Sequence, residues 1–275
     1  MKILIPTDFS QQVDYAWLIT QKLGEQLEME VHFLHVELSS GITLDEAGNL
    51  VSGEDVDLSF YNKLKEMAED KLQSICAPRS NKISTHIAFG PVKDKIIEFA
   101  NAGGFDLIVM GTKGAHGLKE LFSGTETQQV VRHSKVPVLS LMCNRSELNI
   151  KNILLIHEMG KNEPQNLQLM KNIQKAFNAK IHLLKIIESD SKKDAELSKI
   201  AEFALLNKIE NFEAHILKDS DVEAGIIHFN QMHEMDIVCI GTHGRTGFSK
   251  FIKGSVAEKL VNHLFKPIIT FHLND

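Results

Sequence analysis

Two glycine-rich stretches of this chain have residue types and a spacing that suit phosphate binding. Each contains the pattern G-x2-G-x9-G-[S/T], in which a hydroxyl residue follows the last glycine. A glycine lets a ligand approach the backbone without a Cβ in the way, and the free amides at a helix start attract phosphate. The matched positions are Gly111, Gly114, Gly124 and Thr125 in the first stretch, and Gly241, Gly244, Gly254 and Ser255 in the second. Glycines also serve turns alone, but the doubled spacing predicts a phosphate site in at least one half. The pattern is neither a Walker A loop nor the Rossmann GxGxxG.

The two stretches belong to a duplication that covers the whole chain. The glycine stretches match at an offset of 130 residues, whereas "ILIPTD" (3–8) matches "ILLIHE" (153–158) at an offset of 150. A repeat of this length predicts two domains, which we place at residues 1–146 and 147–275. The first half is longer by about 20 residues, in a polar insertion at 39–57. "ITLDEAGNLV" within it predicts a small hairpin.

Each half alternates short apolar runs with segments of helical periodicity. In the first half, strands are predicted at 2–6, 31–36, 83–88, 106–110 and 137–141, and helices at 11–27, 58–75, 92–102 and after the glycine stretch. The central runs "LIVM" and "IVCI" are apolar without alternation, as in strands that are covered on both faces. This order predicts an α/β fold of two tandem doubly wound domains, each with a mainly parallel, Rossmann-like five-stranded sheet. Ligands of such sheets bind outside the carboxyl ends of the strands, where the glycine stretches lie.

Composition excludes several classes of function. The net charge is −6 and the pI is about 6.1, which disfavours nucleic acid as a partner. Three cysteines without a CxxC motif indicate reduced thiols in the cytoplasm, and no apolar run has membrane-spanning length.

His32 and His35 are three apart in a predicted strand and therefore point to opposite faces, so they cannot chelate together. No spacing supports a catalytic triad or a metal site, so no catalytic residue or metal ligand is predicted.

"PTDFS", "LIVMGTKGAHGLKELFSGT" and "GTHGRTGFSKFIKGSVAEKLV" are typical of one family. Over essentially its whole length the chain resembles the universal stress protein family in its tandem two-domain form. The resemblance implies a cytoplasmic stress-response protein that binds ATP or a related adenine nucleotide, with Mg²⁺ as an optional companion. It also implies an intramolecular pseudo-dimer formed by the last strand of each half, and it leaves a homodimer open. Nucleotide sensing is favoured over catalysis; a slow ATPase, a nucleotidyl-transfer relative and a degenerate interaction scaffold are the alternatives.

The resemblance also assigns roles to single residues. Asp8 would contact the adenosine end and Val36 the base, while Met110, Gly111 and Gly114 would run along the ribose and inner phosphates, and Gly124 and Thr125 would hold the outer phosphates. The second-half counterparts are Ile186, Ile240, Gly241, Gly244, Gly254 and Ser255.

The two predicted sites depart from the family pattern at opposite ends. Glu158 stands where the family has aspartate, and Ile156 replaces the proline two residues earlier. In the first half Glu126 follows Thr125, where the second half has Val256. We therefore expect the first half to bind the base better and the second to hold the phosphates better, with adenine nucleotide in the first.

Overall fold

The structure is a computed structural model that describes residues 1–37, 42–44, 50–52, 58–76, 83–112, 126–157, 159, 165–187, 189, 193–242, 260 and 264–272. The predicted site residues Gly114, Gly124, Thr125, Gly244, Gly254 and Ser255 lie outside these ranges, as does Glu158.

Strands and helices alternate through both halves, as the apolar pattern predicts. The first half contains β1 (Lys2–Thr7), α1 (Gln11–Gly24), β2 (Glu30–Glu37), β3 (Ile42–Leu44), β4 (Leu50–Ser52), α2 (Leu58–Cys76), β5 (Ile83–Phe89), α3 (Val92–Ala102), β6 (Leu107–Gly111), α4 (Glu126–His133) and β7 (Val138–Leu141). The second half contains β8 (Asn152–Ile156), α5 (Gln168–Phe177), β9 (Lys180–Ile187), α6 (Lys193–Leu206), β10 (Phe212–Lys218), α7 (Val222–Met232), β11 (Ile237–Thr242) and β12 (Ile268–His272).

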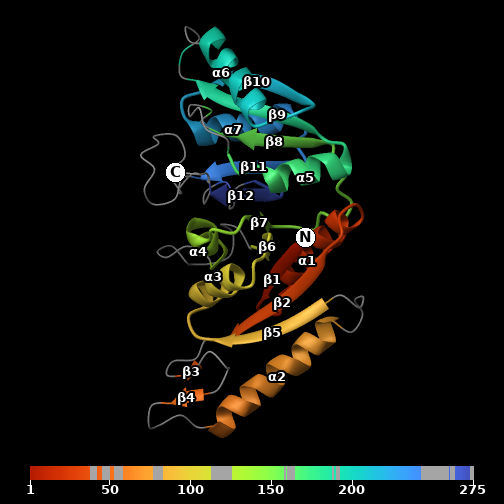
Figure 1. The fold of residues 1–275 in the computed structure, drawn as a ribbon, viewed down its shortest axis with the longest axis vertical. Helices are drawn as coiled ribbons and strands as arrows, with labels where there is room; N and C mark the ends of the chain where they lie inside the picture. The colour runs from red at the N-terminus through yellow and green to blue at the C-terminus, as the bar shows by residue number, and fades with distance from the viewer. Residues whose placement is uncertain are drawn as a thin grey trace.

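One sheet of ten strands runs through both halves in the described part of the chain. Its order is β10-β9-β8-β11-β12-β7-β6-β1-β2-β5, and the halves meet where β12 pairs with β7 (Figure 1). That pair is antiparallel, and every other neighbouring pair in the sheet is parallel. Each half therefore contributes five strands in the same doubly wound order, which confirms the predicted fold class.

Helices cover both faces of the sheet, which explains why its central strands are apolar without alternation. Ile3, Ile5 and Phe33 belong to an apolar cluster shared with α1, α2, α5 and α6, whereas Leu4 and Leu34 belong to a second cluster shared with α3, α4 and α7. Successive residues of a strand point to opposite faces, so a strand between two helical layers needs apolar residues at every position.

Two local predictions can be compared with the structure directly. β3 and β4 pair antiparallel, which confirms the hairpin predicted in the insertion. α1 ends at Gly24, three residues before the predicted end. Glycine is a poor helix former, and after it the amides of Glu25 and Gln26 bond to carbonyls three residues back.

In the ranges described, no helix combines the length and apolar character needed to span a membrane.

Candidate functional site at the carboxyl edge of the sheet

The predicted site residues of the first half that the structure describes lie at one edge of the sheet. The chain runs from β1 outward through β2 to β5 on one side, and through β6 to β7 on the other, so β1 and β6 flank the point where the winding reverses. Asp8 directly follows β1, Gly111 closes β6 and Val36 is the second-last residue of β2. The carboxyl end of strands at such a reversal is where doubly wound folds bind ligands.

A tight turn after β1 sets the backbone at Asp8. Phe9 has a φ of 62°, which is uncommon for a residue with a side chain. The Phe9 amide donates to Thr7 Oγ1 at 3.0 Å, and the Ser10 amide donates to Asp8 Oδ1 at 3.0 Å. Asp8 is exposed, and an ionised carboxylate has about four acceptor positions. Asp8 can therefore hold the turn and still accept hydrogen bonds from a ligand.

His35 of β2 supports this turn from the neighbouring strand, a role that sequence reasoning missed. Its Nδ1 donates to the Thr7 carbonyl oxygen at 2.8 Å, and its ring centroid lies 4.5 Å from that of Phe9. Its Nε2 lies 3.1 Å from a Glu37 carboxylate oxygen. His32 instead meets His86 at 2.8 Å and an edge of Phe105, away from Phe9, so the prediction that the two β2 histidines use opposite faces is confirmed. The alternation of side chains along a strand predicts which face His35 occupies. It does not predict that His35 contacts the turn after β1.

Gly111 is needed for a reason that the sequence did not suggest. A Cβ built on Gly111 would overlap the backbone and Cβ of Gln12, in the first turn of α1. The missing side chain therefore makes room for α1 to pack against β6. Helix packing is sufficient to explain a glycine at this position, whether or not a ligand also approaches the backbone there.

The start of α4 lies beside the end of β6. The Thr127 hydroxyl, in the first turn of α4, donates to the Gly111 carbonyl at 3.1 Å, and the Thr127 side chain is buried. The unbonded amides of a helix start carry a partial positive charge, which favours anions. Glu126, the first residue of α4, is exposed, so its carboxylate can point into solvent.

The second half repeats the turn with different side chains. Met159 has a φ of 51° and its amide donates to His157 Nδ1 at 2.7 Å. Met159 and His157 are the repeat counterparts of Phe9 and Thr7, so a side-chain acceptor two residues earlier holds both turns. His157 is buried and its ring lies 4.5 Å from that of Phe203. The same backbone conformation thus survives the loss of the aspartate between these positions.

The predicted apolar lining residues are almost fully enclosed. Val36, Met110 and Ile186 are buried, and Ile240 has no exposed surface. Ile186 packs under α7, because a Cβ on Gly225 would lie 2.7 Å from its Cδ1. In this conformation Ile240 therefore offers no surface to a ligand.

Known proteins resemble this chain in sequence and in fold. The sequence pattern of the universal stress protein family matches residues 1–141 and again residues 149–272. A universal stress protein of Methanocaldococcus jannaschii is 32% identical over 149 residues, which cover 50% of this chain and 92% of that protein. Universal stress protein G of Salmonella typhimurium is 32% identical over 142 residues, which cover 50% of this chain and 95% of that protein.

A solved universal stress protein from Archaeoglobus fulgidus shares the fold over the full chain. It covers 100% of this chain and 97% of its own, with a TM-score of 0.73 and 20% sequence identity. Together with the two matches to the family pattern, one in each half of the ten-stranded sheet, this leads to one conclusion: the chain belongs to the universal stress protein family and carries two of its domains in tandem.

Proposed function

We propose that this protein binds an adenine nucleotide at the carboxyl edge of its first half and acts in the cytoplasm as a nucleotide-dependent regulator of stress responses. The observation that carries the proposal is the position of Asp8 and Gly111, which follow and close the two strands at the winding reversal. Family membership and the doubled glycine pattern support the same function.

Asp8 is the residue on which recognition of the nucleoside depends in this proposal. Its carboxylate is exposed and the turn at Phe9 fixes its backbone. A hydrogen bond to a charged group contributes about 1.5–3 kcal/mol. That corresponds to roughly one to two decades of affinity for a base amine or a ribose hydroxyl.

The phosphates would lie beside the start of α4. The Thr127–Gly111 hydrogen bond holds this helix start against the end of β6. Helix dipole and free amides favour the phosphate charge there, and Gly124 and Thr125 directly precede the helix. Mg²⁺ would neutralise part of that charge, and Glu126 at the same helix start is a carboxylate of the kind that Mg²⁺ prefers.

We assign the adenine nucleotide to the first half and a weaker or smaller phosphate ligand to the second. Glu158 keeps the charge of Asp8 but is one methylene longer, and Ile156 lacks the rigidity of Pro6. Repulsion from Glu126 weighs less, because an exposed glutamate can turn away from a phosphate.

Titration calorimetry with ATP tests the assignment. Asp8→Ala should weaken ATP binding by about one to two decades, on the hydrogen-bond energies above. Glu158→Ala should leave the tighter binding event unchanged and serves as the matched control. If Asp8→Ala binds ATP like the parent while Glu158→Ala loses it, the nucleotide belongs to the second half. If the parent binds no ATP at all and shows no thermal shift with it, the proposal fails and an interaction scaffold is favoured.

Slow hydrolysis is the second candidate function, since bound ATP at this edge is a substrate as well as a signal. Mass spectrometry of ligand released from fresh protein, followed by phosphate release with added ATP and Mg²⁺, separates the two. Bound ATP without turnover supports regulation. Turnover that is lost in Gly124→Val or Gly254→Val supports an ATPase.

A further inference from the structure

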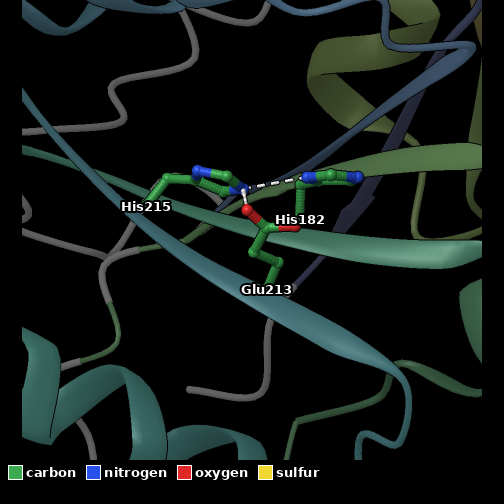
Figure 2. A group of neighbouring side chains, drawn as sticks. All are labelled: His182, Glu213 and His215. Carbon is green, nitrogen blue, oxygen red and sulfur yellow. Dashed lines mark hydrogen bonds and ion pairs between the residues drawn. The ribbon is translucent and has the colours of Figure 1, made fainter.

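Two histidines and a glutamate from different strands converge in the second half. His182 of β9 and His215 of β10 face each other, with His182 Nδ1 2.9 Å from His215 Nε2 (Figure 2). Glu213 Oε1 lies 3.8 Å from the same Nε2. One ligand atom from each residue lies within 4.8 Å of the other two. Within the described ranges, this is the one group of three or more His, Cys, Asp or Glu side chains close enough to share a metal ion.

Strand register brings the three side chains together. Glu213 is the partner of His182 in the parallel β9–β10 ladder, and His215 follows two residues later on the same face of β10. β10 is the last strand of the sheet, so the group lies at an edge. The sequence alone points to no metal ligand here, because His182 and His215 are 33 positions apart and only the register brings them together.

Asn152 of β8 fixes the tautomer of His182. The Asn152 Nδ2 donates to the Glu234 carbonyl at 3.4 Å, so its Oδ1 is the atom 3.1 Å from His182 Nε2. An amide oxygen only accepts, so Nε2 carries the hydrogen and Nδ1 keeps its lone pair. That lone pair faces His215, as in metal sites where an outer hydrogen bond orients the ligating imidazole.

Burial and charge suit a cation that enters from solvent. His182 is buried, whereas half of the Glu213 side chain is exposed, which gives an entry path. Glu213 uses Oε2 for Lys180 at 3.3 Å and keeps Oε1 for the histidines. His233, at the end of α7, is a further ionisable side chain near the group among the described residues. Its ring lies 5.5 Å from that of His215.

The first half contains an equivalent histidine pair, His32 and His86, with which this group can be compared. His32 Nδ1 lies 2.8 Å from His86 Nε2, so the histidine pair is repeated. The residue opposite His32 is Ser84, which offers no carboxylate where the second half has Glu213. Glu30 instead meets the other nitrogen of His32, at 2.7 Å. Among the described residues, three ligands therefore converge at the histidine pair of the second half but not at that of the first.

We propose that His182, His215 and Glu213 bind one divalent transition-metal ion of the Zn²⁺ type, with water in the fourth position. Two imidazoles, a carboxylate and an open position are a ligand set that Zn²⁺ uses in proteins. Bonds of about 2.0–2.1 Å in tetrahedral geometry place two nitrogens roughly 3.3 Å apart, so the rings need to separate by a few tenths of an ångström. His215 would bind in its Nδ1–H form, and its Nε2 proton moves to Nδ1.

This site is separate from the proposed nucleotide site. His182 is the third residue of β9 and Ile186 the seventh, so the two are roughly 13 Å apart along the strand. The metal site lies towards the amino ends of the strands, and the nucleotide site lies beyond their carboxyl ends. Loss of ATP binding would therefore leave the metal proposal standing.

Zinc titration of the tag-free, chelator-treated full-length protein tests the proposal. Calorimetry with Zn²⁺ should show one tight equivalent for the parent. Glu213→Ser, which installs the first-half residue, should weaken that equivalent by at least tenfold, and His215→Gln should remove it. His86→Gln disrupts the matched pair of the first half and should leave the tight equivalent intact.

A spectroscopic readout separates binding from misfolding. Far-ultraviolet circular dichroism with chelator present should be the same for Glu213→Ser and the parent, because Glu213 is exposed. Long-range ¹H–¹⁵N spectra of histidine rings should show that Zn²⁺ shifts His182 and His215 but not His32 and His86. Equal zinc affinity in the parent and in His215→Gln would overturn the proposal, as would loss of the tight equivalent in His86→Gln.

Discussion

Leu139 of β7 and Ile269 of β12 lie opposite each other in the antiparallel pair that joins the two halves. They are also counterparts in the sequence repeat, at the offset of 130 that relates the glycine stretches. On either side, the Ser140 hydroxyl donates to the Ile268 carbonyl at 3.5 Å and the Thr270 hydroxyl donates to the Val138 carbonyl at 3.3 Å. Reciprocal contacts of this kind define a two-fold interface, here within one chain. The predicted pseudo-dimer through the last strands is confirmed; a homodimer stays a prediction.

Truncating this junction should destabilise the fold. Leu139 has no exposed surface, so Leu139→Ala should lower the free energy of unfolding by about 2–5 kcal/mol through lost contacts and the cavity left behind. Urea unfolding measures the change. Leu205→Ala is the matched control, because that leucine is 82% exposed and should stay within about 0.5 kcal/mol of the parent. Equal effects of the two substitutions would contradict the role of Leu139.

Gly111→Ala tests whether packing alone requires this glycine. The added Cβ would overlap the backbone of Gln12, so we expect a loss of about 1–3 kcal/mol in nucleotide-free protein. Thermal unfolding without ligand measures it. Gly24→Ala is the control, because there the nearest atom is the flexible end of Met29 and alanine favours the helix. If Gly111→Ala left the melting temperature unchanged, packing against α1 would not require this glycine, and close approach of a ligand would remain its explanation.

Aspartate capping should stabilise α7 specifically. Asp221 Oδ1 accepts hydrogen bonds from the amides of Glu223 at 2.8 Å and Ala224 at 3.1 Å. Asp221→Ala should cost about 1 kcal/mol, whereas Asp221→Asn keeps an acceptor and should cost less. Urea midpoints of both variants provide the measurement. The equivalent helix α3 begins after Pro91 without a side-chain cap, so the two halves differ here.

Stability should fall as the pH drops below about 6.5. Burial, reinforced by the neighbouring His32, lowers the pKa of His86 from its ordinary value of 6.5. Between that value and the lowered folded-state pKa, the unfolded chain binds more protons than the folded one, so protons favour unfolding. Urea unfolding from pH 7.5 down to pH 5.5 should show this loss, and His86→Gln should flatten the slope. A slope that His86→Gln leaves unchanged would assign the loss to other groups; burial also lowers the pKa of His182 and of His215.

Much of the architecture could be predicted because its signals are local. Helix α3 begins and ends at the predicted residues, since the apolar positions of "VKDKIIEFANA" recur at helical spacing and Pro91 and Gly103 flank it. The buried strand β6 was visible as an uninterrupted apolar run. The duplication also made the β7–β12 junction predictable, because each half leaves the same strand at the edge of its sheet. The boundary between residues 146 and 147 stays a proposal.

What the tertiary structure alone decided are relationships between residues far apart in the chain. His182 lies on one strand and Glu213 and His215 on another, and only the pairing of β9 with β10 sets which residues face each other. The packing of α1 against Gly111 is likewise visible only in the structure, whereas the sequence shows only a glycine that suits close ligand approach. Local patterns report which face of an element is buried, because burial follows each residue's own polarity. The register between elements depends on packing across the whole core, so it is absent from any short stretch of sequence.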